Sequence, residues 1–322
     1  MPNSPKGSLD QVMNCIREAE QHGLLSEFGL GQKDGLSGEK TAGTLQRFVS
    51  LYANEPEACY LEIGVYQGLT LVAAGLSADA MPCYGIDNFR ILDPEGKNLD
   101  IVEQRLEKFN VANAHLINED FEVALHNLES HIGNRKICVY FVDGPHDYRS
   151  QLICLLLIKP YLHDNAVIVI DDANYPDVRQ ATADFLLSHP EFKLAFDAYT
   201  PDHPANLDSE TLIEAEQNWL NGINIIVRDP DGLLPDMAPP TISDKSLYFH
   251  EWLTHRHQIA ELAPESLDLV QAMLLDRTED KTEIEKTLRS KFAESREIYQ
   301  DRKLTRNTYS KNIAGSRFNN FK

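Results

Sequence analysis

The 322-residue chain lacks the features of a disulfide-rich, zinc-binding or membrane protein. Its five cysteines are odd in number and scattered, and no two form a Cys-x-x-Cys pair, so we expect free thiols. No uninterrupted apolar run is long enough to cross a bilayer, and the first residues contain no apolar signal segment. These absences predict a cytoplasmic protein without a membrane partner.

Basic residues are few relative to acidic ones. The chain has 30 Lys and Arg against 50 Asp and Glu, a formal net charge of −20 at pH 7. Such a charge opposes binding to a nucleic-acid backbone, so we expect no nucleic-acid partner and favour a neutral or cationic small molecule as substrate. The hydrophobic fraction of 42% and charged fraction of 25% are those of an ordinary globular protein.

Strand-like and helix-like segments alternate through the middle of the chain. Short apolar runs predict strands over residues 59–63, 83–86, 114–117, 137–142, 166–170, 192–198 and 223–227. Helical patterns predict helices over residues 69–78, 99–109, 121–130, 151–161 and 177–188. The alternation predicts an α/β fold with a doubly wound, mostly parallel sheet. The last two strands have no full helical crossover between them, which indicates an antiparallel edge strand.

Composition divides the chain into three regions. We expect an N-terminal helical cap over residues 1–54, the domain with the sheet over residues 55–232, and a C-terminal helical extension over residues 240–322. The extension ends in a polar, basic tail that we expect to be mobile or to act as an oligomer arm, so we predict a homo-oligomer formed through the terminal extensions. The insertion over residues 200–221 is acidic and helix-prone and carries no recognised motif.

Acidic residues close two neighbouring strands of the expected sheet. Asp143 follows the strand at 137–142, and Asp171 and Asp172 follow the strand at 166–170. Parallel strands end at one edge of a sheet, where ligands bind, so the three carboxylates are expected to share a pocket. Carboxylates this close repel one another unless a cation neutralises them, and magnesium prefers oxygen ligands. The pattern predicts a magnesium site, with helix caps and solvated strand ends as the alternative.

A glycine-containing loop follows the first strand. Glu62, Gly64 and Gly68 give the spacing Glu-x-Gly-x-x-x-Gly, and the dinucleotide fingerprint G-x-G-x-x-G is absent. Gly64 permits a sharp turn, and Gly68 lets the backbone approach a ligand at a helix N-terminus. Asp87 ends the second strand, where an acid can accept hydrogen bonds from both hydroxyls of a ribose. Asp120 follows the third strand, as an adenine contact or as a helix N-cap.

With these acids and glycines, residues 60–228 resemble class I S-adenosylmethionine-dependent methyltransferases, in particular the metal-dependent O-methyltransferases of the catechol, caffeoyl-CoA and macrocin type. The resemblance implies an enzyme that methylates a hydroxyl of a small molecule, such as a sugar or phenol of a secondary metabolite, with S-adenosylmethionine and Mg²⁺ as cofactors. The expected cofactor contacts are Glu62, Gly64, Tyr66, Gly68, Thr70, Asp87, Glu119, Asp120 and Asp143. The expected metal ligands are Asp143, Asp171 and Asp172.

His146 is the expected proton acceptor, with Asp143 as its catalytic neighbour. It stands where several members of that family carry a lysine that deprotonates the substrate, and a neutral imidazole can take a proton at pH 7. The alternative is structural, with His146 capping the next helix or orienting Asp147. Two other functions stay open: metal-independent methylation of a nitrogen or carboxyl group on the same fold, and a methyltransferase-like binding protein without catalysis.

Overall fold

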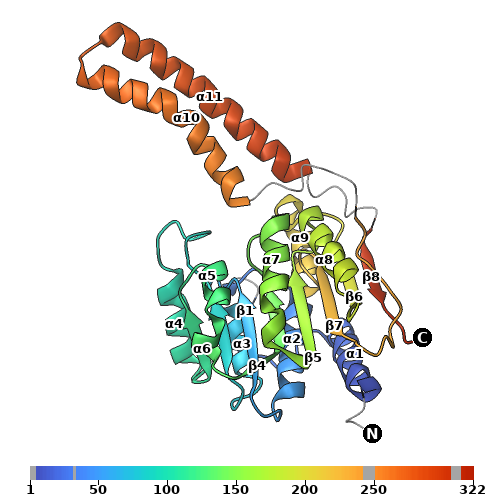
Figure 1. The fold of residues 1–322 in the computed structure, drawn as a ribbon. Coiled ribbons are helices and arrows are strands. Elements are labelled where there is room, and N and C mark those ends of the chain that lie inside the picture. The colour runs from blue at the N-terminus through green and yellow to red at the C-terminus, as the bar shows by residue number, and fades with distance from the viewer. Residues whose placement is uncertain (1–4, 32–33, 242–250, 306–312) are drawn as a thin grey trace.

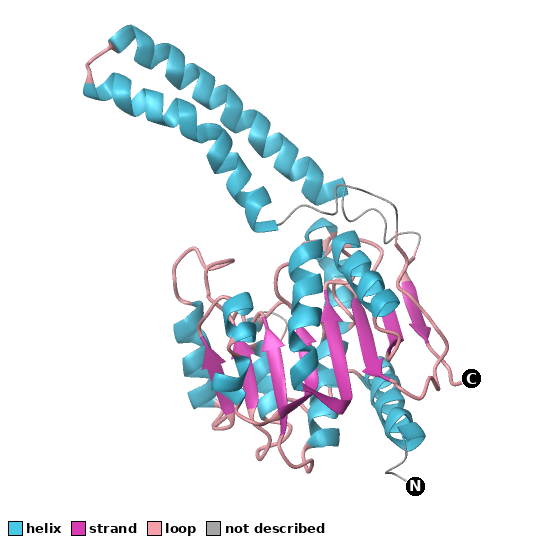
Figure 2. Ribbon diagram, in the orientation of Figure 1, coloured by secondary structure: helices cyan, strands magenta, loops and turns pink. Residues whose placement is uncertain are grey.

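The computed structural model describes residues 5–31, 34–241, 251–305 and 313–322. At its centre is an eight-stranded sheet with helices on both faces, in the strand order β3-β2-β1-β4-β5-β7-β6-β8 (Figures 1 and 2). The strands are β1 (Ala58–Ile63), β2 (Cys83–Ile86), β3 (Ala114–Ile117), β4 (Lys136–Val142), β5 (Leu162–Asp171), β6 (Phe192–Tyr199), β7 (Ile223–Arg228) and β8 (Gly315–Phe318).

The first five strands of the chain are parallel, and the last three form an antiparallel edge. β1 pairs with β2 on one side and with β4 on the other, so the chain reverses its direction of winding between β1 and β4. β7 runs antiparallel between β5 and β6, and β8 lies outside β6. The predicted fold class is confirmed, and the reversal between β1 and β4 marks the place where open α/β sheets bind ligands.

Most of the helices lie on the two sides of this sheet, and the last two extend away from it (Figure 1). The helices are α1 (Pro5–His22), α2 (Glu39–Tyr52), α3 (Leu69–Gly75), α4 (Asn98–Lys108), α5 (Phe121–His126), α6 (Leu128–Ile132), α7 (Tyr148–Ile158), α8 (Pro176–Ser188), α9 (Ser209–Gln217), α10 (Glu251–Leu274) and α11 (Thr278–Thr305). Two short 3₁₀ helices are η2 (Lys159–Tyr161) and η3 (Pro204–Asn206). Within the described residues, every helix is too short or too polar to cross a membrane.

Each face of the sheet has its own core. Tyr60 and Val139 point to the face that α1, α2 and α3 cover. Their neighbours Leu61 and Tyr140 point to the opposite face, which α5, α6, α7 and α8 cover. Because both faces are buried, the central strands are apolar at nearly every position, which explains the continuous apolar runs in the sequence.

The N-terminal helices cover a face of the sheet rather than its ligand edge. In α2, the buried Arg47 donates hydrogen bonds to the carbonyls of Gly23 and Gly43, which ties the connecting segment to the helix. Among the described N-terminal residues, it is the segment between α1 and α2 that reaches the carboxyl edge of the sheet, through Ser37. The region predicted as a helical cap therefore contributes mainly to the core.

The end of the chain returns to the sheet. Residues 315–318 of the tail, expected to be mobile or an oligomer arm, pair with β6 as β8, while residues 306–312 lie outside the described part. Arg317 forms a bidentate ion pair with the fully buried Asp197, and Phe318 packs on Phe196 with ring centroids 4.7 Å apart. Four residues without a long apolar run could not reveal this pairing in advance. The proposed division into regions 1–54, 55–232 and 240–322 stays a prediction.

The pair between Arg317 and Asp197 gives a test of this edge. We expect Arg317→Ala to lower the free energy of unfolding by about 2 kcal/mol, because it leaves a buried carboxylate without its cation. Arg228→Ala is the matched control, since the partner of Arg228, Asp164, is 90% exposed and such pairs contribute at most about 1 kcal/mol. Urea unfolding measures both, and equal losses would contradict the assignment of β8 as an anchored strand.

Candidate active site

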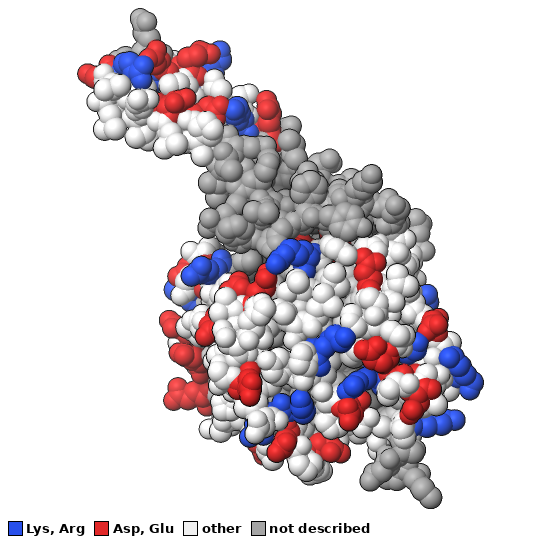
Figure 3. Space-filling view, in the orientation of Figure 1, with Lys and Arg blue, Asp and Glu red and all other residues white. Residues whose placement is uncertain are grey.

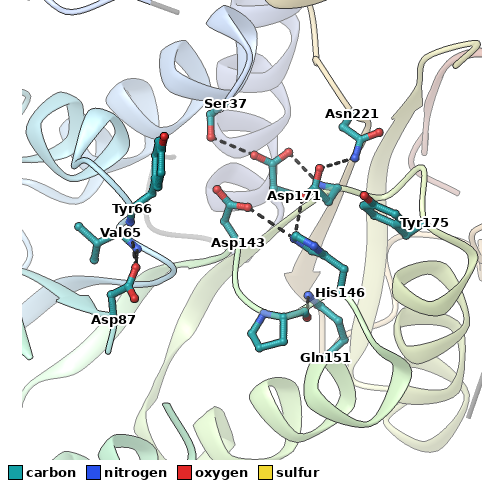
Figure 4. A network of polar contacts seen from close by, with 12 residues as sticks. Ser37, Val65, Tyr66, Asp87, Asp143, His146, Gln151, Asp171, Tyr175 and Asn221 are labelled. Carbon is teal, nitrogen blue, oxygen red and sulfur yellow. Dashed lines mark hydrogen bonds and ion pairs between the residues drawn. The ribbon is translucent and has the colours of Figure 1, made fainter. Parts of the chain in front are cut away.

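The candidate site lies at the carboxyl ends of β1, β4 and β5, beside the point where the winding reverses (Figure 4). Asp143 follows β4, Asp171 is the last residue of β5, and Asp172 comes next with a positive φ of 55°. Asp tolerates this left-handed conformation better than most residues. The sheet thus brings the three predicted acids to one edge, as the sequence analysis expected.

The glycine loop after β1 packs directly on the loop after β4. Gly64 has φ 90°, and a Cβ at this position would lie 1.9 Å from the carbonyl oxygen of Asp143. Only glycine fits such a close approach of two backbones. Gly68, also with positive φ, precedes α3 as its N-cap. The loop therefore leads into the N-terminus of α3 directly beside Asp143.

Asp87 fixes the shape of this loop. One carboxylate oxygen accepts hydrogen bonds from the amides of Val65 and Tyr66, each at 2.9 Å (Figure 4). The other accepts from the amide of Phe89 at 2.8 Å. Tyr66 itself has φ 49°, a conformation that costs energy unless its neighbours hold it. Asp87 is thus placed at the end of β2 as predicted, where its visible partners are backbone amides.

Glu62 lies fully buried within β1. The hydroxyl of Tyr60 donates to its Oε2 at 2.5 Å. Burial raises the pKa of the Glu62 carboxyl to about 8, and the hydroxyls of Tyr60 and Thr70 act against this rise. Glu62 therefore lies below the glycine loop as a carboxyl that is largely protonated at neutral pH. Thr70 is buried in the first turn of α3.

The other two predicted cofactor contacts lie beyond β3, away from the carboxylates of β4 and β5. Asp120 is the N-cap of α5, and its side chain accepts a hydrogen bond from the amide of Glu122 at 3.0 Å. Glu119 lies 3.7 Å from His131. The structure therefore gives Asp120 the helix-capping contact that was the alternative reading, and an adenine contact by either residue stays a prediction.

His146 and two aspartates make the central cluster of the site. The Nε2 atom of His146 lies 2.6 Å from Oδ2 of Asp172 and 3.9 Å from Oδ1 of Asp143. Burial raises the pKa of Asp143 to about 7, and the charge of Asp172 adds to that rise. For Asp172, burial also acts to raise the pKa, but the imidazole of His146 and the amide of Asn221 outweigh it and lower the pKa. Asp172 is thus the ionised acid of the cluster.

Asp171 has different partners. Its Oδ2 accepts a hydrogen bond from the hydroxyl of Ser37 at 3.1 Å, and its Oδ1 accepts from the amide of Asp172 at 3.0 Å. Burial, together with the charges of Asp143 and Asp172, holds the pKa of Asp171 well above its usual range. Among the described residues, the ligand atoms that lie within 4.8 Å of one another belong to Asp143, His146 and Asp172, and Asp171 as a metal ligand stays a prediction.

The helix-capping alternative for His146 is filled by its neighbour. Asp147 caps α7, accepting a hydrogen bond from the amide of Ser150. His146 instead points to the acids and stacks on the ring of Tyr175, with centroids 5.1 Å apart and planes 9° apart. The Tyr175 hydroxyl in turn lies 2.8 Å from Nε2 of His203.

Three segments far apart in the sequence supply residues that the sequence analysis missed. Ser37 comes from the segment before α2, Tyr175 from the N-cap of α8, and His203 and Asn221 from the insertion at 200–221. Asn221 donates to Oδ1 of Asp172 at 2.5 Å, which leaves Oδ2 for His146. The turn dipeptide Asn221-Gly222 was a local signal for a loop, but nothing in the sequence pointed any of these four residues at the acids.

Residues 61–173 match the model of a family described as a methyltransferase domain. This segment is similar to that family. The matched residues include the glycine loop, Asp87, His146 and the three acids at the carboxyl edge of the sheet. No curated protein matches the sequence significantly.

Several solved structures are similar to the chain at low sequence identity. The O-methyltransferase from Bacillus cereus in complex with SAH is 13% identical with a TM-score of 0.45, over 69% of this chain and 90% of that one. The O-methyltransferase TomG from Streptomyces achromogenes, involved in tomaymycin synthesis and in complex with SAM, gives 13% and 0.45 over 68% and 90%. The SAH-bound methyltransferase PaMTH1 from Podospora anserina gives 15% and 0.42 over 68% and 88%.

The buried Glu62 predicts a pH-dependent stability. Its folded pKa of about 8 lies above the ordinary value of 4.5, so the folded state binds a proton that the unfolded state releases, and stability falls as pH rises from about 4.5 to 8. We expect Glu62→Gln to remove this loss, so that its melting temperature exceeds that of the parent by several degrees at pH 8 and by little at pH 5. Thermal unfolding at both values measures the difference, and a gap that does not change with pH would contradict the assignment.

Proposed function

We propose that the chain transfers the methyl group of S-adenosylmethionine to a hydroxyl oxygen of a small molecule, with Mg²⁺ at the acidic edge of the sheet. The observation that supports this most is the convergence of His146, Asp143 and Asp172 beside the glycine loop of the methyltransferase domain. A basic nitrogen and two carboxylates next to a backbone loop match the needs of a reaction that removes a proton and places two substrates in line.

The loop over residues 64–68 would bind the cofactor. S-adenosylmethionine, when bound, supplies the electrophilic methyl group. Gly64 and Gly68, both with positive φ, shape the turn that leads into α3, and Asp87 keeps this backbone in place for a ligand at the N-terminus of the helix. An ionised carboxylate has about four acceptor sites, so Asp87 can receive a ribose hydroxyl in addition to its three amide partners.

The acids fit a divalent cation. Asp143 and Asp171 have raised pKa values because each is buried near other carboxylates, and a cation would relieve that repulsion. We propose Asp143, Asp171 and Asp172 as the residues that hold it, since Mg²⁺ prefers oxygen ligands. When bound, the ion would acidify a hydroxyl that it contacts and orient it.

His146 would accept the proton of the acceptor hydroxyl at Nδ1, because Nε2 lies 2.6 Å from the carboxylate of Asp172 and would donate the hydrogen of that contact. The carboxylates of Asp143 and Asp172 both lie near Nε2, so they would stabilise the imidazolium that forms. Tyr175 would keep the imidazole plane fixed by stacking, and His203 would hold the Tyr175 hydroxyl. The acceptor is expected to enter between these residues and the glycine loop.

One observation favours a second function, metal-independent methyl transfer. The 2.6 Å contact between His146 and Asp172 is by itself a base oriented by an acid, an arrangement that deprotonates substrates without a metal. In this version Asp172 orients His146 without holding a metal, and burial favours the protonated forms of Asp143 and Asp171 because it raises their pKa values. Chelation separates the two proposals.

We expect Asp87→Ala to weaken S-adenosylmethionine binding by about 10-fold to 100-fold, because it removes charge-assisted hydrogen bonds to the loop and to the ribose. Asp229→Ala is the matched control, since Asp229 also accepts two backbone amides, those of Leu233 and Leu234, at a distant turn. Calorimetric titration with S-adenosylmethionine measures both variants. Equal affinity of Asp87→Ala and the parent would reject the role of Asp87.

The metal is tested by binding and by turnover together. With radiolabelled S-adenosylmethionine and a panel of small hydroxyl acceptors, we expect chelator to abolish transfer and added Mg²⁺ to restore it. We expect Asp171→Asn to weaken Mg²⁺ binding in calorimetry, and His146→Ala to lower turnover by about 10² to 10⁴ while Mg²⁺ still binds.

His115→Ala, a change on β3 away from the cluster, is the control for loss of a histidine. Loss of Mg²⁺ binding in His146→Ala alone would make His146 a ligand in place of Asp171. Full transfer in chelator would instead support the metal-independent function.

A further inference from the structure

The helices α10 and α11 form a hairpin that extends away from the sheet (Figure 1). The chain on each side of the hairpin is fixed to the sheet domain. Before it, the carbonyl of Pro240 accepts a hydrogen bond from the buried Arg179, and after it, β8 pairs with β6. The hairpin is therefore inserted between two segments that contact the sheet domain, and it is not a terminal tail.

The two helices bury one side of each other. On α10 the inner positions that are buried or half-buried include Leu262, Leu269 and Ala272, and on α11 they include Ile284 and Leu288. Glu265 of α10 forms an ion pair with Lys291 of α11 across this contact. A hairpin with a single seam has little core of its own, so most of its stability must come from further packing.

A second apolar stripe runs along the outer side of α10. It consists of Ala263, Leu267, Val270 and Leu274, and the last three are exposed by 69%, 52% and 81%. At 3.6 residues per turn these four residues lie within about 60° of one another and roughly 140° from the inner seam. Their intervals of four, three and four residues are those of a helix that packs against another helix along its length.

The residues that flank the stripe carry no charge. Ser266 and Met273 lie on one side, and Pro264 and Gln271 lie on the other. Figure 3 shows this region of the hairpin as a surface without acidic or basic side chains, next to charged residues on its other side. In a chain with net charge −20, this is a surface on which two copies can meet without repulsion between like charges.

The stripe is also complementary to itself. If two α10 helices pack antiparallel around a two-fold axis near residues 268 and 269, Leu267 of one faces Val270 of the other, and Ala263 faces Leu274. Each large side chain at the ends then meets a small one. In the same register Pro264 faces Met273 and Ser266 faces Gln271, so every facing pair is uncharged. A two-fold interface requires this kind of self-complementarity.

We propose that the outer stripe of α10 binds the same stripe of a second copy of this chain, so that two hairpins form an antiparallel four-helix bundle. The predicted homo-oligomer would thus form through this stripe. It is independent of the proposed reaction, because the stripe contains no residue of the candidate site.

Sedimentation equilibrium of the full chain tests the interface. We expect the parent to be a dimer at micromolar concentration, and the double variant Leu267→Asp with Leu274→Asp to raise the dissociation constant by about 100-fold or more, since four leucines lose a buried environment in each dimer. Leu187→Asp is the matched control, because Leu187 is 85% exposed at the end of α8 on the sheet domain. Far-UV circular dichroism checks that each variant keeps its helices.

Cysteine cross-linking tests the orientation without disrupting the stripe. We expect a mixture of Ala263→Cys and Leu274→Cys chains to form a disulfide between copies above the background of the parent. Ala263→Cys alone should not, because antiparallel pairing separates its two copies by about 16 Å along the helix. A monomeric parent, a dimer unaffected by the double variant, or a cross-link between two copies of Ala263→Cys would each overturn the proposal, and a monomer would leave the stripe to a different protein partner.

Discussion

The burial of several carboxyl groups at one edge of the sheet is the constraint on which the rest of the structure depends. Burying an ionised acid without partners costs several kcal/mol. Here the acids divide between two states: burial raises the pKa of Asp143 and Asp171, whereas His146 lowers that of Asp172. Hydrogen bonds from Ser37 and Asn221 complete the arrangement. The parallel strands end at the same edge, so the acids that follow them lie close together. Segments outside the sheet must therefore supply the hydrogen-bond donors for these acids.

That need explains why the N-terminal region and the insertion fold against each other. Gly38, just after Ser37, packs so closely on the insertion that a Cβ would lie 2.2 Å from the carbonyl oxygen of Asn218. The indole of Trp219 donates to Glu20 of α1 at 2.5 Å. The segments that carry Ser37 and Asn221 thus pack against each other beside the site. This packing fixes the positions of both hydrogen-bond donors. They are parts of the site rather than appended lids.

The strands could be predicted from the sequence because burial on both faces leaves continuous apolar runs, and the acids at their ends could be predicted because parallel strands end at one edge. The orientation of each carboxylate could not. Asp171 turns to Ser37, which is 134 residues away in the sequence, and a positive φ at Asp172 turns the next carboxylate to His146 instead. Such long-range partners leave no periodic signal. The pairing of β8 was missed for the same reason, since Arg317 finds its partner Asp197 across 120 residues.

The antiparallel edge explains how this domain can carry a long hairpin without disturbing its site. Parallel neighbours need a crossover that covers a face of the sheet, whereas antiparallel neighbours need only a connection at one end. The chain leaves the sheet after β7 and returns as β8 on the outer side of β6, so the hairpin is inserted where no face has to be covered. The side chains of this edge also connect to the site: the Tyr199 hydroxyl donates to Asp197, the partner of Arg317, and lies 3.0 Å from Oδ1 of Asn224, three residues after Asn221. The strand that anchors the hairpin and the segment that orients Asp172 are therefore packed in one continuous layer.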